Sequence, residues 1–81
     1  MARISAAQDK DLNLVKLGSA VRARRIAMEL SQEALADSAQ IDRSHMGRIE
    51  RGNRNVTFLN IVRIAKALQC KPSELIGDAG L

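Results

Sequence analysis

The sequence predicts an all-α domain, and three observations support this. Apolar residues recur at the three- and four-residue spacing of helices, whereas the sustained alternation typical of strands is absent. No Asn-Gly dipeptide that would form a hairpin turn occurs, and Pro72 is the only proline. Polar residues that suit helix N-caps, such as Ser31 and Asp42, stand just before segments in which apolar residues have helical spacing. The 81 residues are enough for one small domain.

The first helix is expected to run from about Asp11 to Met28. Its apolar stripe consists of Leu14, Leu17, Val21 and Met28. The preceding residues, 1–10, have no helical periodicity, so we expect a loose N-terminal arm that contains one helical turn at most.

Two short helices joined by a tight turn are expected next. The second helix covers about residues 31–39 with Ser31 as its N-cap, and the third covers about 42–51 with Asp42 as its N-cap. Gly52 stands where a left-handed residue ends a helix. The inward-facing residues of the pair are Leu35, Ala36, Ala39, Met46 and Ile49. This layout predicts a helix-turn-helix, in which residues 42–51 form the recognition helix.

A fourth helix is expected after the N-cap Thr57, and a short fifth helix begins with Pro72 and ends at Gly77. The apolar positions of the fourth helix are Phe58, Ile61, Val62, Ile64, Ala65 and Leu68. Phe58 is expected to be buried among them. The predicted organisation is an arm over 1–10, one helix-turn-helix domain over 11–77 and a tail over 78–81.

The charge pattern favours a polyanionic partner. The net charge is +4, and Arg43, Arg48, Arg51 and Arg54 lie within twelve positions of one another. Arginine suits bidentate contacts to guanine and phosphate. A solvated basic face is the alternative explanation. Phe58 is the only aromatic residue, and one ring cannot form the stacking platform of single-strand and RNA readers, so double-stranded DNA is favoured.

Several other kinds of function find little support. Cys70 is the only cysteine, so it is expected to be a small buried hydrophobe rather than a redox switch or part of an internal disulfide. His45 has no partner at metal-binding spacing and is expected to face solvent or to make a minor DNA contact. No carboxylate pair, nucleophile–base arrangement or glycine-rich phosphate loop stands out, so neither an enzyme nor a cofactor is expected. No apolar run suits a membrane span or a signal peptide, and a cytoplasmic location is expected.

The outer face of the third helix supplies the candidate base contacts, which are Arg43, Ser44, Gly47 and Arg48. Gly47 has two explanations, because a glycine inside a helix lowers stability and needs a reason. A bare backbone would allow close approach to the bases, or the glycine would allow close packing against another helix. Its expected outward position favours the first explanation.

The candidate phosphate contacts are Gln32, Asn53, Arg54 and Asn55. Gln32 lies at a helix N-terminus, where free amides and the helix dipole attract anions. The others lie in the loop after the recognition helix and would position the protein without reading sequence. Each of them has an alternative as an ordinary surface residue, and Asn55 has one as a loop or capping residue.

Glu50 is an acidic residue in a basic helix, next to the core residue Ile49. An unpaired, half-buried carboxylate would be costly. We therefore expect an ion pair between Glu50 and Arg25 that ties the first helix to the third.

The sequence resembles the Xre/Cro, lambda-repressor-like helix-turn-helix family over about Leu17 to Ile76. The resemblance is carried by the motifs Leu30-Ser31-Gln32-Glu33-x-Leu35-Ala36, Asp42-Arg43-Ser44, Ile49-Glu50-Arg51-Gly52, Ile64-Ala65-x-Ala67-Leu68 and Pro72-Ser73-Glu74-Leu75. The sections Asp42 to Met46 and Arg51 to Thr57 are in addition similar to controller proteins of restriction–modification systems.

The resemblance implies a compact five-helix domain that binds operator DNA as a homodimer. It implies that Arg43, Ser44 and Arg48 face bases and that Gln32 and Arg54 face phosphates, and it agrees with the Arg25–Glu50 pair. Dimerisation is implied through the C-terminal helices, with Leu59, Val62, Leu75 and Ile76 as candidates. Relatives often carry glycine where this chain has Glu29, Gln40 and Gln69, so either mildly strained residues at positive φ or turns of different geometry are expected there.

The expected function is sequence-specific regulation of transcription at a roughly palindromic operator. A repressor would block polymerase, and an activator would touch RNA polymerase. The alternative is an antitoxin-like or adaptor module that uses the same fold and gives its apolar C-terminal face to another protein.

Overall fold

The structure, a computed structural model, describes residues 4–81. These residues form one short 3-10 helix, η1 (Ala6–Gln8), and five α-helices: α1 (Asn13–Ala27), α2 (Gln32–Ala39), α3 (Arg43–Arg51), α4 (Phe58–Ala67) and α5 (Pro72–Asp78). Over this range no residue belongs to a strand. The predicted all-α, five-helix fold is confirmed. Each of these helices is too short or too polar to cross a lipid bilayer.

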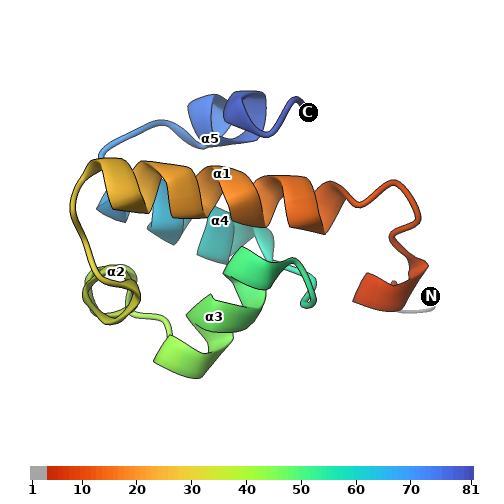
Figure 1. Cartoon of the computed structure of the whole chain (residues 1–81), viewed down its shortest axis with the longest axis horizontal. Helices are drawn as coiled ribbons and strands as arrows, with labels where there is room; N and C mark the ends of the chain where they lie inside the picture. Colours follow the sequence, from red (N-terminus) through yellow and green to blue (C-terminus); the bar gives the residue numbers. More distant parts are fainter. Residues whose placement is uncertain (1–3) are drawn as a thin grey trace.

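The long helix α1 runs through the middle of the molecule and organises the others (Figure 1). In that view α5 lies along one side of α1, while α2 and α3 lie on the opposite side and α4 lies behind it. α1 packs against α3 and α5, and α2 packs against α3 and α4. α4 and α5 also touch, so the five helices enclose a single core.

The core contains the residues that the helical periodicity places inward. The most completely buried large side chains are Val21, Leu35, Met46, Ile49, Ile64 and Leu75. Leu17, Ala36 and Ala39 are buried as predicted, whereas Leu14 and Met28 are only partly buried. The prediction that Phe58 is buried is wrong, because 69% of its surface is exposed. It is the first residue of α4, and the buried face of that helix begins one turn later, at Ile61.

All three predicted N-caps are present. The Ser31 hydroxyl accepts a hydrogen bond from the Ala34 amide at 3.0 Å, and the Thr57 hydroxyl accepts one from the Asn60 amide at 3.2 Å. The Asp42 carboxylate accepts one from the Ser44 amide at 3.1 Å. These bonds satisfy amides that have no partner within the helix, which explains why α2, α3 and α4 begin where they do.

The turns contain left-handed residues that are not glycine. Glu29, Gln40 and Gln69 have φ angles of 57–58°, the first of the two alternatives expected for them. Leu12 also has a φ angle of 58°, which the sequence did not predict. Because Leu12 is left-handed, α1 begins at Asn13 rather than at Asp11, and the carboxylate of Asp9 accepts a hydrogen bond from the Leu14 amide at 2.7 Å.

Candidate nucleic-acid interface

The helix α3, predicted from the sequence to be the recognition helix, has two different faces. Met46 and Ile49 point into the core, whereas Arg43, Ser44 and Arg48 are exposed. The exposed residues border a concave surface between α2 and α3, lined by Gln32, Asp42, Arg43, Ser44, Gly47, Arg48 and Arg51. Three arginines therefore lie on one side of the molecule together with Gln32 and Ser44, which stand at the N-termini of α2 and α3. Such a surface suits a polyanion.

The N-terminus of α3 is organised by Asp42 and Ser44. Both the amide and the hydroxyl of Ser44 donate hydrogen bonds to the same carboxylate oxygen of Asp42. The hydroxyl of Ser44, followed by the amide of His45, holds the pKa of Asp42 below its usual value, so the cap stays ionised at neutral pH. In the free protein the Ser44 hydroxyl thus serves the cap, and its oxygen remains available as an acceptor.

The Arg25–Glu50 pair, predicted from the charge pattern, is present. Arg25 Nε and Nη2 donate to the two oxygens of Glu50 at 2.8 and 3.0 Å. Nη1 of the same guanidinium donates to the carbonyl oxygen of Leu30 at 2.9 Å. The Glu50 side chain is 3% exposed, and that of Arg25 is 13% exposed. The pair therefore ties α1 both to α3 and to the residues that lead into α2.

Gln32 joins this network from the first position of α2. Its amide Nε2 donates to Oε1 of Glu50 at 3.2 Å, and the residue is half-buried. One amide hydrogen is used in this bond, while the second can serve a phosphate oxygen at the edge of the concave surface. The buried Glu50 thus orients the amide of Gln32, which is predicted to contact a phosphate.

Gly47 lines the α2–α3 concavity on the outer face of α3, but the side chains of its neighbours bury it in the free protein. A Cβ atom at this position would lie 3.2 Å from Nη1 of Arg51 and 3.3 Å from Oε1 of Gln32. The side chains of two neighbours therefore cover the glycine. Close packing, the second of the two explanations given above, accounts for its position in the helix.

The loop after α3 lines a different hollow from the α2–α3 concavity. Asn53, Arg54 and Asn55 are exposed and border a hollow whose other wall is the N-terminal arm, from Ile4 to Ala6. Nδ2 of Asn55 donates to the carbonyl oxygen of Ile4 at 2.9 Å, which agrees with the loop role left open for this residue. Among the four predicted phosphate contacts, only Gln32 lines the concavity together with the predicted base contacts.

Two residues of α3 were incompletely predicted. Arg51 was left out of the predicted contacts, although its three-residue spacing from Arg48 was a signal for the same face. His45 does not face solvent freely: it is half-buried, and its Nε2 is buried without a hydrogen-bond partner within residues 4–81. Burial, followed by the charge of Arg54, lowers the pKa of His45, so its ring is neutral at pH 7.

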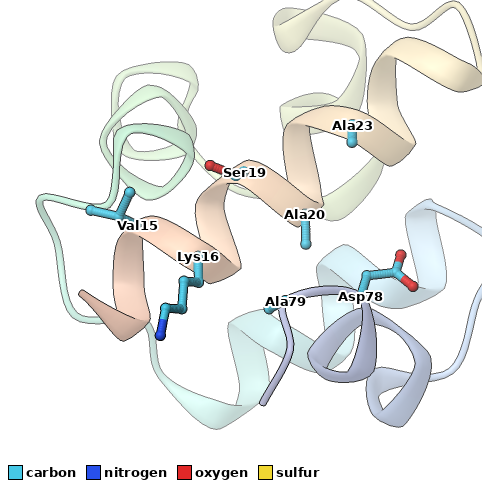
Figure 2. A pocket seen from close by; sticks show the side chains of 7 residues that line it. All are labelled: Val15, Lys16, Ser19, Ala20, Ala23, Asp78 and Ala79. Carbon is cyan, nitrogen blue, oxygen red and sulfur yellow. The ribbon is translucent and has the colours of Figure 1, made fainter. Parts of the chain in front are cut away.

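A second concave surface lies between α1 and α5 (Figure 2). Small side chains such as Ser19, Ala20 and Ala23 line much of it, with Lys16 and Asp78 as its charged residues. One positive and one negative charge give no net attraction for a polyanion. The α2–α3 concavity, with three arginines and one aspartate, is therefore the better candidate for a nucleic acid.

The predicted dimer residues fall into two groups. Leu59 is 65% exposed, and Val62 and Ile76 are half-buried, so these three can contact a partner. The prediction that Leu75 contacts a partner is wrong, since its side chain is fully buried in the core.

Cys70 is half-buried against the core. Burial raises the pKa of its thiol, which disfavours the reactive thiolate.

The sequence and fold match known helix-turn-helix proteins. A helix-turn-helix family model matches residues 21–75. Control protein C.SmaI from Serratia marcescens is 38% identical over 65 residues, which cover 80% of this chain and 77% of that protein. Control protein C.BamHI from Bacillus amyloliquefaciens is 42% identical over 60 residues, which cover 73% of this chain and 74% of that protein.

A solved structure shows the same arrangement of helices. The restriction-modification controller protein C.AhdI from Aeromonas hydrophila superposes with a TM-score of 0.75 and 50% sequence identity. The match covers 76% of this chain and 94% of that one. The chain therefore belongs to the helix-turn-helix family of DNA-binding transcriptional regulators.

Proposed function

We propose that this protein binds an operator as a homodimer and controls transcription of the genes of a restriction–modification system. The observation that carries the proposal is the exposed row of Arg43, Ser44 and Arg48 on a helix whose opposite face is buried. The names of the relatives C.SmaI, C.BamHI and C.AhdI support the controller role.

In this proposal α3 enters the major groove with its exposed face toward the base edges. Arg43 and Arg48 each donate two hydrogen bonds to O6 and N7 of a guanine, and Ser44 contacts a neighbouring base. Gln32 binds a phosphate at the N-terminus of α2, where free amides add their attraction. Arg54 and the exposed amide of Asn53 bind the backbone beyond the recognition helix, and Arg51 adds a further cation to the same face.

A second copy of the chain is proposed to cover the exposed apolar start of α4. Phe58 and Leu59 are 69% and 65% exposed and follow one another on this helix. Adjacent exposed apolar side chains of this size are typical of an interface, and Val62 and Ile76 are the half-buried residues that we assign to the same contact. Two-fold symmetry would then place two recognition helices about one turn of DNA apart.

The effect on transcription follows from where the dimer sits. A dimer over a promoter blocks polymerase, whereas a dimer beside it activates by contacting RNA polymerase. In either case the chain acts by binding and positioning, and we propose no enzymatic step.

The decisive experiment is selection of bound sequences from random double-stranded DNA, followed by a mobility-shift titration. We expect a palindromic site whose two halves are centred about 10 base pairs apart. Affinity should fall steeply with added salt, because each phosphate contact releases counterions. Retention of all sequences equally would overturn the proposal of specific regulation.

Light scattering tests the oligomeric state independently. We expect a dimer for the parent chain and a monomer for Leu59→Asp, because a carboxylate cannot be buried unpaired in an apolar contact. A parent chain that stays monomeric but co-purifies with a different protein would favour the adaptor function instead.

A further inference from the structure

The absence of a side chain at position 47 determines where Gln32 lies. The carboxamide of Gln32 rests over Gly47, since Oε1 would lie only 3.3 Å from a Cβ atom there and Cδ would lie 3.8 Å away. From this position Nε2 reaches Oε1 of Glu50 at 3.2 Å. The side chain of Gln32, from α2, therefore packs against α3 at Gly47.

The bond between Gln32 and Glu50 tolerates little movement. A distance of 3.2 Å is at the long end for an N–H···O hydrogen bond. A Cβ atom at position 47 would require its neighbours to shift by a few tenths of an ångström. A shift of that size away from α3 takes Nε2 beyond bonding distance of Glu50. Arg51, the other neighbour, is exposed, so its guanidinium can swing aside.

Glu50 is itself held in place by the core. Arg25 binds both of its oxygens, and its side chain is 3% exposed. The acceptor for Gln32 is therefore fixed, and of the two partners in this hydrogen bond it is Gln32 that must move when position 47 is filled. The chain of contacts runs from α1 through Arg25 and Glu50 to the amide of Gln32 at the edge of the α2–α3 concavity.

We propose that Gly47 is a positioning residue for DNA binding, which acts by allowing Glu50 to hold the Gln32 amide in its phosphate-binding orientation. The inference rests on the proposed function for its DNA step. It assigns to Gly47 an indirect role in place of the direct base contact expected from the sequence. Preorganisation of Gln32 before binding lowers the entropy lost when the complex forms.

The test uses Gly47→Ala in the full chain, with Gly77→Ala as a matched control. Gly77 is also helical, but a Cβ atom there would meet nothing within 4 Å. Both variants replace a glycine by a better helix former, so Gly77→Ala should melt at or above the temperature of the parent. In Gly47→Ala this gain is offset by the loss of the bond between Gln32 and Glu50, so that variant should melt close to the parent. The side-chain amide signals of Gln32, followed by nuclear magnetic resonance in the free protein, should change in Gly47→Ala and stay unchanged in Gly77→Ala.

DNA affinity is then measured on the selected operator in a double-mutant cycle with Gln32→Ala. Gly47→Ala should weaken binding about three- to tenfold in the parent background, as for loss of one positioned hydrogen bond. In the Gln32→Ala background it should have almost no effect, and Gly77→Ala should have none in either.

Three results would overturn the inference: unchanged Gln32 signals in Gly47→Ala, unchanged affinity of that variant, or an equal loss in both backgrounds. The last result would mean that the added methyl group meets DNA directly. A parent chain that selects no DNA site would overturn the proposed function instead, while the Gln32 signals would still report whether Gly47 positions that side chain.

Discussion

The two faces of α3 differ in their exposure and in the contacts that their side chains make. On the inner face, Met46, Ile49 and Glu50 are at most 7% exposed, and each is surrounded by the fold. On the outer face, Arg43 and Arg48 are exposed, and neither makes an ion pair or a side-chain hydrogen bond within residues 4–81. The interactions of the inner face thus stabilise the fold, while the guanidinium donors of the two outer arginines stay free to bind a partner.

Because the two faces differ in this way, mutations on each face should affect a different property of the protein. Substitutions on the inner face should change the free energy of unfolding, and substitutions on the outer face should change DNA affinity. Gln32 and Gly47 lie between the two faces and should affect DNA affinity through the contact of Gln32 with buried Glu50.

Gly18→Ala should have the largest effect, on stability. A Cβ atom there would lie 2.6 Å from the carbonyl oxygen of Glu50 and closer still to that of Ile49, so α1 and α3 would have to separate. We expect a loss of at least about 3 kcal/mol in the free energy of unfolding. Urea unfolding measures it, and Gly77→Ala is the control. A fully stable Gly18→Ala would show that the α1–α3 contact is not as close as described.

Arg25→Ala should have the next largest effect. It leaves the carboxylate of Glu50 buried without its ion-pair partner, which is costly. We expect a loss of about 2 kcal/mol in the free energy of unfolding, less than for a fully buried pair because the Arg25 side chain keeps 13% exposure. The matched control is Arg22→Ala on the exposed face of α1, which should melt like the parent. Equal melting temperatures for both variants would contradict a stabilising role for the pair.

Arg48→Ala should lower DNA affinity and leave stability almost unchanged. The exposed side chain contributes little to the core, so thermal unfolding should stay within about 0.5 kcal/mol of the parent. Affinity for the selected operator should fall about tenfold and discrimination at one base pair should relax, because a bidentate contact to guanine is lost. A uniform loss on all DNA sequences would assign Arg48 to phosphate rather than to base recognition.

Gln40→Gly should have the smallest effect and the opposite sign. Gln40 has a φ angle of 58° in the turn between α2 and α3, a conformation that glycine adopts without strain. Relief of that strain is partly offset by the greater freedom of the unfolded chain, so a gain of about 0.5 kcal/mol in stability is expected. DNA affinity should not change, since the turn keeps its geometry. Reduced affinity in a more stable variant would show that the turn itself tunes the recognition helix.

Local patterns were sufficient for much of the fold. The N-caps Ser31, Asp42 and Thr57 act on amides two or three residues away, so the chain encodes them directly. Helical spacing likewise identified Leu35, Met46 and Ile49 as core. Two of the errors concern residues near helix ends: Leu12 adopts a left-handed conformation, so α1 begins later than predicted, and Phe58 lies outside the core at the start of α4.

Short-range spacing was enough to predict the helices, their caps and the helix-turn-helix layout, and the cost of an isolated buried charge was enough to predict the Arg25–Glu50 pair. Contacts between distant segments were needed to show that Leu75 is core, that Gln32 covers Gly47 and that Asn55 binds the N-terminal arm. Each of these three features depends on which distant helix or segment packs next to the residue. Periodicity reports the direction in which a side chain points on its own helix, but not which neighbour covers it.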